Sequence, residues 1–467
     1  MLQRAAPILI HERAVDEREE EQIFICKDIA QFLFDGFDLG PKFFEWIHIY
    51  ILFHLSVMDK EIILSPMTKI NHHFQKLTGA YLFPEIERRI KTLQEKQPHA
   101  KLLNLGIGDV TTPLSASVIA ALLEASKEMG DKATFRGYGP SEGYLFLRQK
   151  IAEMDYRNIS PDEIFISDGA NTDLGNLQEI FAVDNRIAIP DPAYPVYVDT
   201  NVMAGRTRPL LKTGRYGGIT YLPCTEENQF QPQPPLVHVD LIYLCSPHNP
   251  TGVAMDRELL SRWVKYAKEH QAVILFDGAY EAFITSGAPR SIYEIEGAKE
   301  VAIEVRSFSK SAGFTGLRCS YTVVPHELKV YDAGAFHSLH SLWKRRVETK
   351  SNGVSYPIQK GAAALYTEAG QKEIRALVRP VNERAKVLRE GLKQLGYTVY
   401  GGIDAPYIWC KTPPKVTSWE FFDFLLEHVH IVTVPGLGFG QEGDGYIRFS
   451  AFAEPIAESL DRFKGLA

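Results

Sequence analysis

The chain has 467 residues and a formal net charge of -7. This length predicts more than one domain, or one large α/β body with an added lobe. Hydrophobic residues make up 45% and charged residues 23% of the chain, which excludes fibrous, disordered and coiled-coil classes. Because there is no basic excess, we expect no nucleic-acid partner. The 5 cysteines form no CxxC pair or Cys/His cluster, which argues against a disulfide framework and favours a reducing compartment.

The first 66 residues differ in composition from the rest. Residues 16–21 are an acidic run (DEREEE), and residues 43–57 are an apolar, aromatic run (FFEWIHIYILFHLSV). A membrane-spanning helix needs about 20 apolar residues, whereas this run has 15, with one glutamate and two histidines among them. We therefore favour an added helix over a membrane segment, and expect no membrane partner. A third interpretation is that translation starts at Met58 or Met67.

From Met67 onward, short apolar runs alternate with helical segments. The runs predict strands at residues 163–167, 186–189, 241–246, 272–277, 301–307 and 320–324. Strands that are apolar on both faces favour a mostly parallel sheet covered by helices. Residues 256–270 predict one such helix, with Asp256 as its N-cap. After residue 356 the pattern predicts a long helix over 375–395, then strands and a terminal helix, which form a smaller lobe.

In such a sheet, functional groups gather where strands end. Lys310 follows the run 301–307 within Ser-Phe-Ser-Lys, and Arg318 comes eight residues later. The hydroxyls of Ser307 and Ser309, together with the guanidinium of Arg318, are suited to holding a phosphate dianion. A lysine beside a phosphate-bearing aldehyde can form a Schiff base and then act as nucleophile and proton carrier. The alternative is a plain surface lysine.

Two more loops carry polar groups that suit a planar cofactor. Asp277, with Tyr280 three residues later, ends an apolar strand, where a carboxylate is costly unless it is paired. It is suited to face a pyridinium nitrogen, with an N-cap or a salt-bridged core acid as the alternative. Asn249 begins Asn-Pro-Thr-Gly directly after another strand, a sequence that is rare there by chance.

The remaining two loops suit a phosphate and a ring. Ala170 and Asn171 lead into a helix predicted near residues 173–181, and the free N–H groups at a helix start favour phosphate. Tyr194 lies in the rigid turn Asp-Pro-Ala-Tyr-Pro. That turn can hold the aromatic ring flat over a cofactor.

In order and spacing, these loops resemble those of the fold type I pyridoxal 5′-phosphate aminotransferases of class I and II, from Thr68 to the C-terminus. The resemblance implies a large domain, with a mostly parallel seven-stranded sheet between helices, and a smaller α+β domain. It implies that Lys310 binds the cofactor, Asp277 pairs with the ring nitrogen, and Asn249 and Tyr280 bond the ring oxygen. The remaining cofactor residues that it implies surround the phosphate or stack on the ring: Ala170, Asn171, Tyr194, Ser307, Ser309 and Arg318.

Four further segments resemble the LL-diaminopimelate aminotransferases: residues 77–83 (LTGAYLF), 105–110 (LGIGDV), 135–140 (FRGYGP) and 349–353 (TKSNG). The resemblance implies that Tyr138 and Asn352 help to bind the cofactor, partly across a subunit boundary. It therefore implies a homodimer with shared active sites. The mild acidity of the chain and the expected reducing compartment favour a cytoplasmic location. The substrate-binding residues that it implies are Tyr81, Gly108, Tyr194, Asn249, Asn352 and Arg448, the last of which binds the α-carboxylate.

The reaction implied is transamination between LL-2,6-diaminopimelate and 2-oxoglutarate, giving tetrahydrodipicolinate and glutamate for lysine and peptidoglycan synthesis. Two departures concern the donor. Asn171 stands where the family has lysine, and Ser141, followed by Glu142, stands where it has glutamate. These changes leave lysine, or another long amino acid, as an alternative donor. A decarboxylase or synthase of the same fold would share Lys310 and Asp277, but Arg448 favours transamination. A cofactor-binding regulator is disfavoured because no DNA-reading module is visible.

The expected division of the chain has four parts. Residues 1–66 are an N-terminal extension, 67–111 an arm with part of the small domain, 112–355 the large cofactor-binding domain, and 356–467 the C-terminal small domain. No metal site is expected, because the scattered histidines lack acids or cysteines at ligand spacing. The glycine-rich run 436–440 lacks the βαβ context of a dinucleotide site.

Overall fold

The computed structural model describes residues 68–77, 82–106 and 108–465. Residues 71–467 form one compact unit. The apolar run 43–57 and Tyr81 lie outside the described residues, so the predictions about them stay untested. Within the described ranges, none of the helices is long and apolar enough to cross a membrane.

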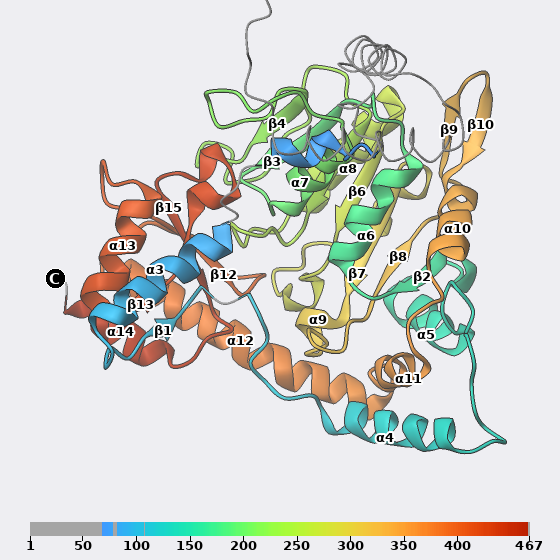
Figure 1. Cartoon of the computed structure of the whole chain (residues 1–467), viewed down its shortest axis with the longest axis horizontal. Helices are drawn as coiled ribbons and strands as arrows, with labels where there is room; N and C mark the ends of the chain where they lie inside the picture. Colours follow the sequence, from blue (N-terminus) through green and yellow to red (C-terminus); the bar gives the residue numbers. More distant parts are fainter. Residues whose placement is uncertain (1–67, 78–81, 107, 466–467) are drawn as a thin grey trace, which may run out of the picture. The chain divides into compact units, whose positions relative to one another are not determined.

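A seven-stranded sheet forms the centre of the larger lobe (Figure 1), with the strand order β2-β8-β7-β6-β5-β3-β4. Five neighbouring strands, β4, β3, β5, β6 and β7, pair in parallel in that order. Strand β8 is antiparallel to both of its neighbours, β7 and β2. This confirms the predicted mostly parallel sheet. Its strands are β2 (Ile164–Ser167), β3 (Ile187–Asp191), β4 (Ile219–Pro223), β5 (Leu241–Cys245), β6 (Val273–Asp277), β7 (Ala302–Ser307) and β8 (Ser320–Val323).

Helices pack against the sheet. At the start of α8 (Arg257–His270), Asp256 accepts a hydrogen bond from the Leu259 N–H at 2.7 Å, as its predicted N-cap role requires. By contrast, α6 begins at Ala170, three residues before the predicted start, and passes into a 3₁₀ turn at Leu177–Ile180. The helices of this lobe are α4 (Ala116–Gly130), α5 (Leu145–Asp155), α6 (Ala170–Asn176), α7 (Val196–Met203), α8 (Arg257–His270), α9 (Phe308–Ser311), α10 (Leu339–Lys350) and α11 (Tyr356–Ala364). A hairpin of β9 (Lys329–Asp332) and β10 (Ala335–Ser338) precedes α10.

The smaller lobe is built on a four-stranded antiparallel sheet of order β11-β12-β15-β14. The strands are β11 (Val399–Gly401), β12 (Tyr407–Lys411), β14 (Val434–Pro435) and β15 (Tyr446–Ser450), and β1 (Leu103–Asn104) pairs separately with β13 (Ile431–Val432). Its helices are α3 (Leu82–Lys96), α12 (Glu368–Gln394), α13 (Ser418–Val429) and α14 (Ile456–Lys464). The residue limits proposed for the domains stay predictions.

The two lobes meet at the loop after β6. Tyr280 and Phe283 belong to the apolar core that also contains Tyr407, Trp409 and Phe452 of the smaller lobe. This loop begins at Asp277, the last residue of β6. The carboxyl end of β6 is therefore tied to the smaller lobe by shared apolar packing.

Candidate active site

The predicted loops meet at one cavity of about 380 Å³, into which the ends of β6 and β7 lead. This is where functional groups gather in open α/β sheets. Most of the predicted site residues line it: Gly108, Ala170, Asn171, Tyr194, Asn249, Asp277, Tyr280, Ser307, Ser309, Lys310, Arg318 and Arg448. Residues that the sequence did not single out line it as well: Phe83, Asp109, Leu174, Ala279, Thr315 and Tyr407.

Lys310 reaches the cavity from α9, the short helix after β7. The Ser307 hydroxyl caps this helix by accepting a hydrogen bond from the Ser309 N–H at 3.1 Å. The Lys310 ammonium donates to the backbone carbonyl of Gly108. Burial lowers the pKa of Lys310 to about 8; Asp109 opposes this shift, and the nearby Arg448 and Arg318 charges reinforce it. The lysine thus reaches its neutral, nucleophilic form closer to neutral pH than an exposed lysine does.

Asp277 is a buried carboxylate whose hydrogen-bond donors are all neutral. It accepts hydrogen bonds from the Tyr197 hydroxyl at 2.6 Å and from the Ala279 N–H at 3.0 Å. Burial raises the pKa of Asp277, although both hydrogen bonds oppose the shift. Because no ion pair is found for it within the described residues, a cation placed in the cavity would stabilise its charged form.

Arg318 lies at the end of the cavity near the start of α6. A Cβ atom on residue 169 would lie 2.2 Å from Arg318 Nη2, so the guanidinium packs directly against Gly169. Arg318 Nη1 donates to the Thr315 carbonyl at 3.1 Å. Ser307 and Ser309 line the same cavity, so hydroxyl and guanidinium donors are available there for an anion.

Arg448, on β15, is 2% exposed. Its Nη1 donates to Asn249 Oδ1 at 2.7 Å, and its Nη2 donates to the Gly106 carbonyl at 3.2 Å. Its Nε is buried and has no hydrogen-bond partner among the residues that the structure describes. The guanidinium carbon lies 4.3 Å from the ring centroid of Tyr407. A planar cation held in this way is suited to bind a carboxylate.

Two predicted site residues lie away from this cavity. Tyr138 is 90% exposed, and Asn352 is also exposed. Their segments contact each other, since a Cβ on Gly353 would lie 2.9 Å from the Pro140 carbonyl oxygen. Glu142 is held by an ion pair with Lys344 at 3.3 Å and does not line the cavity.

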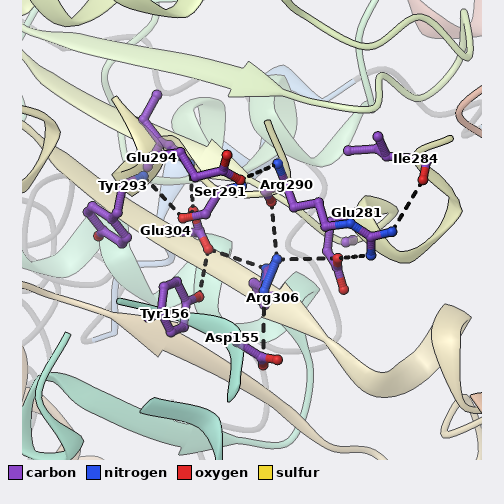
Figure 2. Close-up of polar contacts among 12 residues, drawn as sticks. Asp155, Tyr156, Glu281, Ile284, Arg290, Ser291, Tyr293, Glu294, Glu304 and Arg306 are labelled. Carbon is purple, nitrogen blue, oxygen red and sulfur yellow. Dashed lines mark hydrogen bonds and ion pairs between the residues drawn. The ribbon is translucent and has the colours of Figure 1, made fainter. Parts of the chain in front are cut away.

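An ion-pair network centred on the buried Arg306 joins the end of β7, which leads into α9 and Lys310, to the loop that carries Tyr280 (Figure 2). Arg306 directly precedes Ser307, and its guanidinium lies 3.4 Å from Glu281, the residue after Tyr280. It also lies 3.3 Å from Glu304 and 4.0 Å from Asp155. Because breaking a buried pair leaves an uncompensated charge, this network holds the end of β7 close to the loop after β6. A larger hollow of about 1290 Å³ borders the network, but of the predicted site residues only Ser307 lines it.

Comparison with known proteins places this arrangement in a family. The family model for aminotransferase class I and II matches residues 100–463. The chain is a class I and II aminotransferase. It is 42% identical to the L,L-diaminopimelate aminotransferase from Chlamydomonas reinhardtii, over 86% of this chain and 99% of that one, with a TM-score of 0.81.

More distant relatives share the architecture. A substrate-bound BacF structure from Bacillus subtilis is 27% identical over 86% of this chain and 98% of its own, with a TM-score of 0.72. The aspartate aminotransferase from Thermus thermophilus with maleate is 21% identical over 86% of this chain and 100% of its own, with a TM-score of 0.71. The last comparison shows a shared fold only.

Class I and II aminotransferases work with pyridoxal 5′-phosphate. The cavity of this aminotransferase fits that group chemically. Lys310 offers an amine with a lowered pKa, Asp277 is a buried carboxylate with only neutral donors, and Arg318 offers a guanidinium beside two serines. These groups match an aldehyde, a pyridine nitrogen and a phosphate.

Proposed function

We propose that this aminotransferase transfers an amino group from LL-2,6-diaminopimelate to 2-oxoglutarate, giving tetrahydrodipicolinate and glutamate, a step in making lysine and peptidoglycan precursors. The observation that carries the proposal is the 42% identity to the L,L-diaminopimelate aminotransferase over 99% of that chain. The segments 77–83, 105–110, 135–140 and 349–353, which resemble those of that enzyme, also support the proposal.

In this proposal Lys310 is the nucleophile and the proton carrier. When bound, the cofactor supplies an electron sink for the carbanion formed at the substrate Cα. Lys310 Nζ would move the proton from the substrate Cα to the cofactor carbon that carried the aldehyde, while Asp277 would hold a proton on the ring nitrogen. Tyr280 and Asn249 bond the ring oxygen. The phosphate is bound by Ala170, Asn171, Ser307, Ser309 and Arg318, with Tyr138 from the other subunit.

The proposed substrate residues line the same cavity or are expected to reach it. Arg448 takes the α-carboxylate through its guanidinium, and Tyr194 stacks on the cofactor ring beside it. Gly108, Tyr81 and Asn352 complete the proposed substrate contacts. Arg448 is already bonded to Asn249 at 2.7 Å, so the carboxylate-binding residue and a ring-oxygen ligand are physically linked.

Asn171 bears directly on which amino acid is the donor. Asn171 lines the cavity where the family has lysine, and Glu142 is held by Lys344 at 3.3 Å. Loss of a cation weakens binding of a distal carboxylate, which LL-diaminopimelate has and lysine lacks. Lysine, or another long amino acid, is therefore the second candidate donor.

A donor panel tests the proposal. The purified enzyme is assayed with LL-diaminopimelate, lysine, aspartate and phenylalanine, each with 2-oxoglutarate, and kcat/KM is compared. LL-diaminopimelate as best donor supports the proposal, and lysine as best donor supports the second candidate. Aspartate or phenylalanine as best donor contradicts both.

We also infer a homodimer with shared active sites. Exposed apolar side chains follow one another on α4 and the loop after it: Ile119 at 42%, Leu123 at 60%, Phe135 at 60% and Tyr138 at 90% exposure. Exposed apolar patches mark interaction sites, so we expect a second subunit to cover these side chains. The proposed cofactor ligand Tyr138 lies among them, as expected of a residue that serves the partner's site. The cytoplasmic location stays a prediction.

A further inference from the structure

Tyr407 is a cavity residue to which neither the sequence motifs nor the proposed reaction gives a role. It lies at the start of β12 in the smaller lobe and is 1% exposed. Its side chain lines the cavity beside Tyr280 and Arg448. A Cβ placed on Gly108 would lie 3.7 Å from the Tyr407 hydroxyl and 3.9 Å from Arg448 Nη2, so both groups border the proposed substrate position.

The Tyr407 side chain contacts two proposed functional groups at once. Its hydroxyl lies 2.8 Å from the Tyr280 hydroxyl, and the two rings meet at 67°. Its ring face lies 4.3 Å from the guanidinium carbon of Arg448. A guanidinium over an aromatic face is held by the ring quadrupole. One side chain therefore touches both a proposed ligand of the cofactor ring oxygen and the proposed carboxylate-binding residue.

The direction of the hydroxyl pair follows from the role proposed for Tyr280. If Tyr280 donates its single proton to the ring oxygen, its own oxygen can only accept from Tyr407. Hydrogen bonds in such a chain polarise one another, so the Tyr407 donor strengthens donation by Tyr280. The Tyr407 hydroxyl thus acts on the cofactor through Tyr280 without touching it.

The backbone leaves Tyr407 little freedom to move. In the β12–β15 pairing, Trp409 is opposite Arg448 and Tyr407 is opposite Ser450, so Tyr407 lies diagonally from Arg448 on the same face. The Tyr407 carbonyl accepts a hydrogen bond from the Gly402 N–H at 2.8 Å. A Cβ on Gly252, at the end of Asn-Pro-Thr-Gly, would lie 2.2 Å from the same carbonyl oxygen.

We propose that Tyr407 is a positioning residue that couples carboxylate binding at Arg448 to the hydrogen bond donated by Tyr280. The inference rests on the roles proposed above for Tyr280 and Arg448. It predicts that two properties depend on different parts of one side chain: the hydroxyl sets the electronic state of the cofactor, and the ring sets the affinity for the substrate carboxylate.

Tyr407→Phe separates the effect of the hydroxyl on the cofactor from the effect of the ring on carboxylate binding, because it keeps the ring and removes the hydroxyl. The pH titration of the visible absorbance of the bound cofactor is the readout. With a weaker donor from Tyr280, the ring oxygen is more basic and retains its shared proton to higher pH, so the absorbance midpoint rises. We expect a rise of roughly 0.3–0.5 pH units, a fraction of what one full hydrogen bond contributes. KM for both substrates should stay within about two-fold, because the stacked ring remains.

Three companion variants make the outcome specific. Tyr280→Phe should raise the same midpoint by more than Tyr407→Phe does; if neither variant moves it, the site assignment itself fails. Tyr446→Phe is the matched control, because it removes a hydroxyl bonded to Glu226 at 2.9 Å in the same sheet but outside the cavity. Its titration should match the wild type. Tyr407→Leu removes the ring as well and should raise KM several-fold.

Two results would overturn the inference. One is a Tyr407→Phe titration that matches the wild type while Tyr280→Phe shifts it. The other is a Tyr407→Phe shift no larger than that of Tyr446→Phe, since a general loosening of the sheet would then explain both. Each leaves the proposed transamination intact, so failure of the inference can be told from failure of the function.

Discussion

Arg448 shows how one side chain is prepared before any substrate arrives. It is 2% exposed, bonded to Asn249 and to the Gly106 carbonyl, and stacked on Tyr407. Its Nε has no hydrogen-bond partner in the described structure. The planar, five-donor guanidinium can keep these contacts and still bind a carboxylate, which an ammonium cannot do.

Arg448→Lys should therefore raise KM for both the amino and the keto acid by roughly 10- to 100-fold, the range expected for losing hydrogen bonds to a charged group. Steady-state kinetics measure the effect. Arg384→Lys is the matched control: this small-lobe arginine donates from Nε to the Ala451 carbonyl at 2.8 Å but does not line the cavity. An unchanged KM in Arg448→Lys would contradict the proposed carboxylate site.

Single residues also show where prediction from sequence stops. Lys310, Asp277 and Asn249 could be predicted because each follows an apolar strand, and the strand ends converge. Tyr407 and Tyr197 could not be. Each lies among apolar residues and reads as an ordinary core aromatic, and only the fold brings their hydroxyls to Tyr280 and Asp277.

At the scale of elements, the loop after β5 in the larger lobe packs closely against β12 of the smaller lobe. Gly252 has φ +71°, and a Cβ there would lie 2.2 Å from the Tyr407 carbonyl oxygen. The glycine of Asn-Pro-Thr-Gly is thus needed for both its backbone conformation and its closeness to the other lobe.

Gly252→Ala should lower the free energy of unfolding by roughly 3 kcal/mol, combining an unfavourable φ with a backbone clash. Gly287→Ala isolates the first cost: residue 287 has φ +87°, and a Cβ there meets nothing within 4 Å. We expect that control to lose only about 1 kcal/mol. Equal losses in urea denaturation would show that contact with Tyr407 contributes nothing.

The sequence predicts the existence of the interior strands more accurately than the first and last residues of the helices. Buried, uniformly apolar runs such as residues 241–246 identify interior strands of the sheet, whereas β4 was missed because it is an edge strand with half-exposed side chains. The helix predicted from residue 375 in fact begins at Glu368, where the Thr367 side chain caps it by accepting from the Gly370 N–H. The capping hydroxyl of Thr367 marks the start of this helix, and it lies several residues before the apolar residues on which the prediction is based.

At the scale of the whole molecule, we predict that one chain alone holds an incomplete active site. Tyr138 and Asn352 lie on adjoining exposed segments away from the chain's own cavity. A two-fold dimer can place them in the partner's cavity, because a closed two-fold interface uses the same patch from both copies.

Mixing two inactive variants tests this sharing. If Lys310→Ala and Tyr138→Ala subunits exchange freely, half of the dimers are mixed, and each mixed dimer has one complete site. Activity should then recover to about a quarter of the wild type. No recovery, with exchange verified by differently tagged subunits, would show that the two residues do not serve one shared site.

The central claim is that the chemistry runs at Lys310 in the 380 Å³ cavity. The most direct measurement is borohydride reduction of the cofactor-loaded enzyme, followed by peptide mass spectrometry to locate the trapped cofactor. We predict the adduct on Lys310, and its loss, together with turnover, in Lys310→Ala. An adduct on any other lysine, or turnover that survives in Lys310→Ala, would contradict the account.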